Sequence, residues 1–190
     1  LADTQLAIFE CIRSRSNASR FVLCPTYYSD DPLLVKHFGA QPSRYLETLG
    51  QALPPDVSIF WTGPEVISQA YPREHLCEVI TRLGRKPVLW DNYPVNDAKR
   101  LTPFLHLQPF AQRRDALGQQ FSIASVMDLC DGLLANPMNQ PYLSQIPLAS
   151  LADLYCKQTG MTSTPLLSTP SLRQLAADGD SFQHRGLEKL

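Results

Sequence analysis

The sequence lacks any apolar run near the roughly 20 residues that a membrane-spanning helix requires, and it lacks an excess of charge of one sign. Its 17 basic and 18 acidic side chains give a formal net charge of -1, which argues against a nucleic acid or an anionic membrane as a partner held through bulk charge. Residues 1–10 carry two acids and no basic residue, unlike a secretory signal peptide. We therefore expect a cytoplasmic protein without a membrane span.

The five cysteines lack any Cys-x-x-Cys spacing, and their number is odd. Neither a disulfide framework nor a zinc site is predicted, so a reducing compartment fits best. Several cysteines stand inside apolar runs, where we expect small buried hydrophobic side chains. The histidines show no metal-ligand spacing, and each is expected to be a surface or capping residue: His37, His75, His106 and His184.

The length and hydrophobic content suit one globular domain. The 190 residues include 44% hydrophobic side chains, enough for a substantial core, but a complete (β/α)₈ barrel usually needs about 250 residues. Four apolar, β-favouring runs alternate with helical patterns, and a polar loop follows each run. The strands are predicted at residues 21–24, 57–61, 88–90 and 132–135, and the helices at 3–16, 32–38, 43–51, 72–84, 119–130 and 141–156.

This alternation predicts an α/β fold with a parallel sheet, in which the loops after the four strands share one rim. Four strands cannot close a barrel, so the predicted architecture is half of a TIM-type barrel. Asp3 is expected to cap the first helix, and the Ser29–Pro32 segment to start the second. Thr62 and Gly63 are expected to shape a tight exit from the second strand.

The third strand is followed by a dense group of polar side chains. Val88, Leu89 and Trp90 are apolar, and the strand should end before Pro94, which cannot donate to a sheet ladder. Strands that end in amides, carboxylates and aromatic rings build the ligand sites of α/β barrels, but loop Asn and Asp residues also occur for turn reasons. A ligand site and a plain closing loop both remain open for this group: Asp91, Asn92, Tyr93, Asn96 and Asp97.

The four strand endings carry Cys24–Tyr28 (CPTYY), Phe60–Pro64 (FWTGP), Trp90–Asp97 (WDNYPVND) and Ala135–Gln140 (ANPMNQ). Together, in this order and spacing, they resemble the second half of the catalytic barrel of glycoside hydrolase family 84, the β-N-acetylglucosaminidases that include the O-GlcNAcases. The resemblance implies three parts. Residues 1–158 would form strands five to eight of the barrel, residues 159–170 a linker and residues 171–190 the start of a helical domain.

The resemblance implies substrate-assisted hydrolysis of terminal N-acetylglucosamine, without a metal or organic cofactor. In the family the acetamido oxygen of the substrate attacks the anomeric carbon, and two adjacent aspartates orient that group and act as general acid and base. The one adjacent acid pair here, Asp30–Asp31, suits a helix start instead. We therefore expect no catalytic residue in this chain, the family pair upstream of Leu1, and little or no hydrolysis by the chain alone.

The resemblance also implies a site for one amino sugar. Tyr28 and Trp90 would line the acetamide pocket. Asn92 would hydrogen-bond within the site, Asp97 would accept from the sugar's 4- and 6-hydroxyls, and Asn136 would bond neighbouring hydroxyls. A charged acceptor in such a place discriminates strongly, because losing its partner leaves a desolvated carboxylate unpaired.

Plainer interpretations stand beside these roles. Trp61 and Trp90 could both be core aromatics, and Asn136 could be a turn former before Pro137. Tyr27 stands where relatives of the family often carry an acid, which is a small departure from the pattern.

The implied partner is a glycan or glycoprotein that contains N-acetylglucosamine. A half-barrel also exposes two strand edges, so a homodimer or association with a separate N-terminal half is predicted. Two other classes stay open: a non-catalytic carbohydrate-binding or protein-interaction module derived from the barrel, and a partner-binding α/β domain whose loops do not bind sugars.

Overall fold

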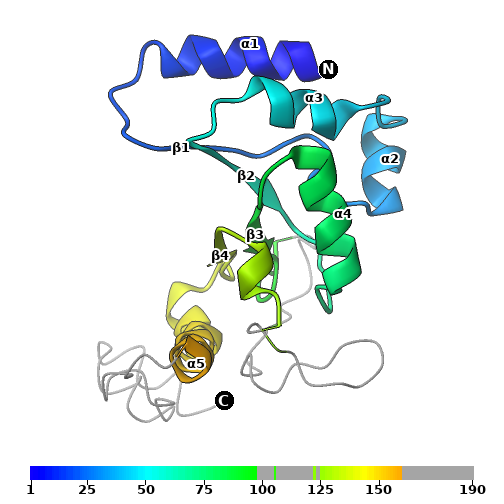
Figure 1. Ribbon diagram of the computed structural model, residues 1–190. Coiled ribbons are helices and arrows are strands. Elements are labelled where there is room, and N and C mark those ends of the chain that lie inside the picture. Colours follow the sequence, from blue (N-terminus) through cyan, green and yellow to red (C-terminus); the bar gives the residue numbers. More distant parts are fainter. Residues whose placement is uncertain (98–104, 106–121, 123–124, 160–190) are drawn as a thin grey trace. The chain divides into compact units, whose positions relative to one another are not determined.

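The computed structural model describes residues 1–97, 105, 122 and 125–159 (Figure 1). Contacts within the chain group these residues into two units. The first comprises residues 1–91 and 125–134, and the second takes its residues from 92–124 and from 135 onward. Each unit is described by itself below.

The sheet has four strands in the order β1-β2-β3-β4. Strand β1 (Phe21–Leu23) runs parallel to β2 (Val57–Trp61), with Phe21 opposite Val57. Strand β2 in turn runs parallel to β3 (Val88–Asp91), with Phe60 opposite Val88. The predicted parallel sheet is therefore confirmed for β1 to β3, and β4 (Gly132–Ala135) lies at the place predicted for the fourth strand.

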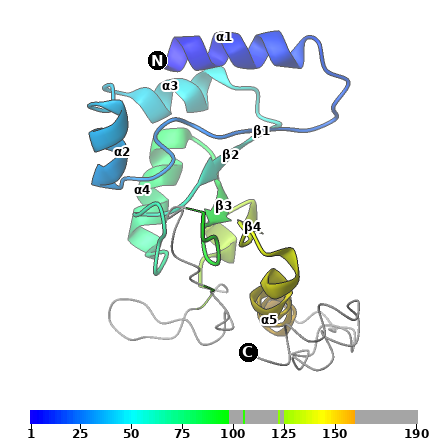
Figure 2. The same cartoon turned by 180° about the vertical axis from the view of Figure 1, so that it is seen from behind.

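Four helices belong to the first unit: α1 (Ala2–Arg13), α2 (Pro32–Phe38), α3 (Tyr45–Ala52) and α4 (Arg73–Leu83). Helices α3 and α4 lie in front of the sheet in Figure 1 and behind it in the reversed view of Figure 2, so they cover the same face. They approach closely because position 50 is a glycine: a Cβ there would lie 2.0 Å from the Leu83 carbonyl oxygen. Between helices and sheet lie fully buried side chains, including Leu46, Leu49, Ile59, Leu76, Val79 and Leu89.

Local signals explain two of the helix ends, the start of α2 and the end of α4. Asp31 is the N-cap of α2, because its Oδ1 accepts from the Leu33 N–H at 2.8 Å and Pro32 opens the first turn. Helix α4 ends at Gly84, whose φ of 66° is left-handed. The expectation for Asp3 was wrong. Leu1 occupies the N-cap of α1 without a side-chain bond, and Asp3 lies in the first turn, where its charge favours the helix dipole.

Arg85 ties the end of α3 to the start of β2. Its guanidinium donates to four carbonyl oxygens, at 2.6 Å to Gly50, 2.8 Å to Leu53, 2.7 Å to Pro54 and 3.0 Å to Val57. Unsatisfied carbonyls at a helix end carry partial negative charge, so a guanidinium there satisfies both charge and hydrogen bonding.

The predicted helix over residues 119–130 was wrong in the part that the structure describes. Residues 127–129 form only a short 3₁₀ turn, η2 (Met127–Leu129). At this turn Arg73 on α4 donates two 2.8 Å hydrogen bonds to the Asp128 carboxylate and one to the Ser125 carbonyl oxygen.

In the second unit, α5 (Pro141–Thr159) is the one helix among the described residues, and it reaches the first residue of the predicted linker. The rest of that linker, residues 160–170, and the predicted helical segment 171–190 lie outside the described residues. The division into three parts therefore stays a prediction.

The prediction of buried cysteines was largely wrong. All five are free thiols, but Cys11, Cys24 and Cys77 are exposed, Cys156 is half-buried and only Cys130 is buried. Apolar neighbours in sequence did not ensure burial, because Cys11 and Cys77 lie at outward-facing positions of α1 and α4. Among residues 1–97, 105, 122 and 125–159, no helix is long and apolar enough to cross a membrane. Within the same residues, no group of three or more His, Cys, Asp or Glu side chains could hold a metal ion.

Candidate functional site

Two adjacent tyrosines follow β1, and they have different surroundings. Tyr27 is 2% exposed, and its hydroxyl donates to the Gly39 carbonyl oxygen at 2.9 Å, so it anchors the end of α2. Tyr28 is half-buried. Burial, then the neighbouring Cys24 and Asp31, raises the pKa of the Tyr28 phenol above its ordinary 10.0. Tyr28 therefore keeps its proton at neutral pH and can donate a hydrogen bond.

The loop after β2 holds the loop of Tyr28 in place. The Thr62 N–H donates to the Tyr28 carbonyl oxygen at 2.8 Å, and the Thr62 hydroxyl donates to the Glu65 carbonyl oxygen at 2.9 Å. Gly63 has a φ of 97°, and a Cβ at that position would lie 2.4 Å from Ser68 Oγ. The predicted tight exit at Thr62 and Gly63 is confirmed, and glycine is needed there for both reasons.

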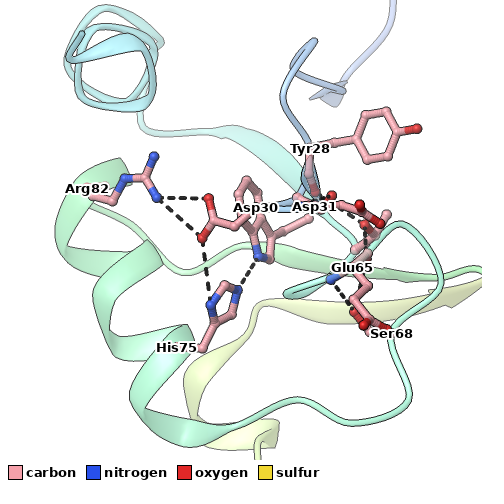
Figure 3. A network of polar contacts seen from close by, with 10 residues as sticks. Tyr28, Asp30, Asp31, Glu65, Ser68, His75 and Arg82 are labelled. Carbon is pink, nitrogen blue, oxygen red and sulfur yellow. Dashed lines mark hydrogen bonds and ion pairs between the residues drawn. The ribbon is translucent and has the colours of Figure 1, made fainter. Parts of the chain in front are cut away.

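Asp31 connects the same two loops (Figure 3). Its Oδ1 caps α2, and its Oδ2 accepts from the Val66 N–H at 2.9 Å. Both carboxylate oxygens are thus engaged by backbone groups. The structural interpretation of this acid as a helix start is confirmed.

Asp30, the other member of the acid pair, belongs to a separate cluster with α4. Its carboxylate lies 3.1 Å from Arg82 Nη1 and 3.7 Å from His75 Nδ1. Figure 3 shows the Tyr28 ring pointing away from this cluster. Asp30 therefore belongs to an ion pair with α4.

His75 completes the cluster through Trp61. The Trp61 Nε1–H donates to His75 Nε2 at 3.1 Å, and the two rings stack with centroids 6.0 Å apart. Because Nε2 accepts, the proton of the neutral imidazole must lie on Nδ1, toward Asp30. Burial lowers the pKa of His75 below 6.5, although Asp30 and Glu78 oppose the shift. The expectation of a surface or capping role was thus wrong for His75, while Trp61 is a core aromatic with 0% exposure.

The third strand places its last two side chains differently. Trp90 is half-buried, and its ring meets Phe60 edge to face at 4.6 Å. Asp91 was expected in the polar group beyond the strand, but it is the last residue of β3 and is 0% exposed, following the alternation that also buries Leu89. Part of the Trp90 surface therefore remains accessible to a ligand.

The second unit brings together the loops after β3 and β4. Asn136 Nδ2 donates to Asn92 Oδ1 at 3.0 Å. Asn96 Nδ2 donates to Gln140 Oε1 at 2.8 Å, and Asn96 Oδ1 accepts from the Asn139 N–H at 3.0 Å. Asp97, on the same loop as Asn92 and Asn96, is exposed. Three of the five predicted sugar-binding residues thus lie on two loops that hydrogen bonds join.

The predicted residues fall into two groups. Tyr28 and Trp90 belong to the first unit, and Asn92, Asp97 and Asn136 to the second. A single mouth formed by all five stays a prediction. The sequence interpretation missed the inter-loop role of Asn96, although it stands inside the polar stretch and beside Asp97.

Comparison with known proteins identifies the chain. The profile of the β-N-acetylglucosaminidase family matches residues 3–183. The chain belongs to that family. The resemblance to glycoside hydrolase family 84 that the strand endings indicated is thereby confirmed.

Similar members of the family are longer proteins. The protein O-GlcNAcases of Rattus norvegicus and Mus musculus are each 31% identical over 135 residues, which are 71% of this chain but 13% of theirs. A solved structure, an O-GlcNAc hydrolase of Thermobaculum terrenum studied as a mutant, matches with a TM-score of 0.64 and 30% identity. That match covers 94% of this chain and 34% of the bacterial one. The chain thus spans about 13% of the length of these curated β-N-acetylglucosaminidase relatives.

Proposed function

We propose that the chain supplies sugar-binding loops of a β-N-acetylglucosaminidase, as strands five to eight of its (β/α)₈ barrel. In this proposal the substrate is a terminal N-acetylglucosamine on a glycan or protein. Tyr28 and Trp90 bind the acetamide group, and Asn92, Asp97 and Asn136 bind the hydroxyls. The observation that carries the proposal is the hydrogen bond between Asn92 and Asn136, because it joins loops from two strands in a member of this family.

The amide pair suits a sugar site for a chemical reason. Each amide offers both a donor and an acceptor, so after bonding to one another Asn92 and Asn136 still present groups of both kinds. Sugar hydroxyls also donate and accept. The exposed carboxylate of Asp97 adds a charged acceptor, which makes the stronger type of hydrogen bond.

The acid pair of this chain does not supply the chemistry in this proposal. Both carboxylate oxygens of Asp31 accept hydrogen bonds from backbone N–H groups, and Asp30 forms an ion pair with Arg82. Neither has the paired environment that would hold one carboxyl protonated and the other ionised. The general acid and the acetamide-orienting aspartate are therefore assigned to another part of the natural protein.

The half-barrel assignment rests on the parallel sheet and on the share of a related barrel enzyme that this chain covers. Parallel strands with intervening helices are the repeating unit of such barrels, and the match to the bacterial hydrolase covers 34% of that chain. Val22 on the edge strand β1 is 48% exposed, so the sheet face to which its side chain points is open at this strand.

Replacing Asp97 by Ala tests the sugar site. In the natural protein that contains this chain, we expect Asp97→Ala to weaken binding of an N-acetylglucosamine-derived competitive inhibitor by about 10- to 100-fold, the equivalent of one charged hydrogen bond. Titration calorimetry measures the change. Asp131→Ala is the matched control, because Asp131 is also an exposed aspartate but precedes β4.

Two outcomes would contradict the proposal. Equal affinity of wild type and Asp97→Ala would remove Asp97 from the site. Absence of any inhibitor binding by the natural protein would instead support a module that does not recognise this sugar.

A further inference from the structure

Asn96 holds together the two loops of the second unit. Its side-chain oxygen accepts from the Asn139 N–H at 3.0 Å, and its side-chain nitrogen donates to Gln140 Oε1 at 2.8 Å. Because both atoms belong to one planar amide, the two bonds fix the orientation of the side chain as well as its position. A residue that only closed a turn would bond within its own loop, whereas these partners stand 43 and 44 residues away.

The position of Asn96 in sequence links these bonds to Asp97. Among residues 1–97, 105, 122 and 125–159, no hydrogen bond or ion pair reaches the Asp97 carboxylate, and that side chain is exposed. The location of the carboxylate therefore depends on the backbone that carries it. Asn96, the preceding residue, anchors this backbone to the loop after β4, which also carries Asn136.

The three inter-loop bonds form a series. The Asn92–Asn136 bond lies nearest the strand ends, and the two Asn96 bonds join the loops farther along the chain. A pair of loops joined at two places cannot slide or rotate freely, so the groups between them keep a constant spacing. Fixed spacing is what a site needs in order to distinguish hydroxyl configurations.

We propose that Asn96 is a positioning residue for sugar recognition: it sets the distance between Asp97 and Asn136, and so the preference for the configuration of the 4-hydroxyl. This inference rests on the proposed function. Asn96 itself need not contact the sugar. Its effect on specificity passes through the two residues that do.

The test replaces Asn96 by Ala in the natural protein and follows steady-state kinetics with aryl N-acetylglucosaminide and its 4-epimer, the N-acetylgalactosaminide. We expect KM for the first substrate to rise about tenfold with kcat changed less than about threefold, because uniform binding is lost. We also expect the preference over the 4-epimer to fall. Asn139→Ala is the matched control, since Asn139 takes part through its backbone N–H, which alanine keeps.

A merely structural role would give a different result. If Asn96→Ala lowered the melting temperature but left KM and the epimer preference within about twofold of wild type, the inference would be overturned. If Asn96→Ala did not fold, Gln140→Ala would decide, because it removes one of the two bonds and should shift KM and preference in the same direction by less. An unchanged Gln140→Ala would then count against the inference.

The two proposals can fail separately. Loss of the epimer preference in Asp97→Ala but not in Asn96→Ala would leave the sugar site and reject the positioning role. No effect of either substitution would reject the sugar site itself.

Discussion

At the scale of single residues, identical side chains in neighbouring positions have different tasks. Tyr27 is sealed in the core with its hydroxyl on the Gly39 carbonyl, whereas Tyr28 keeps part of its ring accessible. Asp30 and Asp31 likewise differ: Asp30 forms an ion pair with Arg82, and Asp31 accepts from one backbone N–H of α2 and one of the loop after β2. A sequence motif names such pairs but does not say which member faces which way.

His75 makes the stability depend on pH. Its folded pKa lies below 6.5 because burial disfavours the charged form; Asp30 and Glu78 act against this shift, and Arg82 adds to it. Above the unfolded value both states are neutral. As the pH falls through 6.5, the unfolded chain takes up a proton that the folded one resists, and stability is lost down to the folded pKa.

We therefore expect the urea midpoint of wild type to fall more than that of His75→Gln between pH values of about 7.5 and 5.5. The glutamine oxygen can still accept from Trp61 Nε1, so the variant keeps that bond but does not titrate. Circular dichroism at both pH values measures the midpoints. Equal falls for the two proteins would show that His75 does not set this dependence.

At the scale of elements, the connection between α3 and β2 depends on a residue that neither element contains. Arg85 follows α4, yet it donates hydrogen bonds to carbonyl oxygens at and just after the end of α3. The capping of α3 is thus completed only when α4 has packed against it.

Replacing Arg85 by Lys is expected to destabilise the fold by about 1–3 kcal/mol, because a compact ammonium cannot reach the four carbonyls that the planar fork spans. Arg82→Lys is the comparison, since Arg82 contacts a single carboxylate that an ammonium can still approach. Denaturant titration should show a clearly lower midpoint for the first variant. Comparable losses of stability in the two variants would contradict a special role for the planar guanidinium of Arg85.

The elements show how far sequence patterns reach. Strands, the proline and Asp31 start of α2, and the glycine end of α4 follow from local signals, and each was predictable. The 3₁₀ turn at residues 127–129 was not: the Arg73–Asp128 pair that accompanies it joins residues 55 positions apart in sequence. The contacts of Arg85 and Asn96 could not be predicted for the same physical reason. Their partners are distant in sequence, so no local period or spacing indicates them.

At the scale of the whole molecule, the sheet order places β1 at one edge. Val22 in the middle of that strand is 48% exposed and pairs only on the β2 side among the described strands. An edge that presents free backbone groups and an apolar side chain favours pairing with another chain or with a separate strand.

We therefore expect the 190-residue chain, prepared alone, to elute as a dimer or larger species in size-exclusion chromatography with light scattering. Val22→Lys should shift it toward the monomer, since a charge on an edge strand opposes edge pairing. Val35→Lys is the matched control, because Val35 is 47% exposed but lies on α2. A well-folded wild-type monomer would contradict the prediction that this edge pairs with another chain.

The two tryptophans give the molecule a pair of optical reporters. Trp61 is enclosed in the core and bonded to His75, while Trp90 keeps an accessible surface beside Phe60. Intrinsic emission thus has a shielded source and a solvent-sensitive one. In the Trp90→Phe variant the remaining fluorescence comes from Trp61 and reports unfolding. The difference between the spectra of wild type and this variant is the emission of Trp90, which changes when a molecule binds against its indole ring.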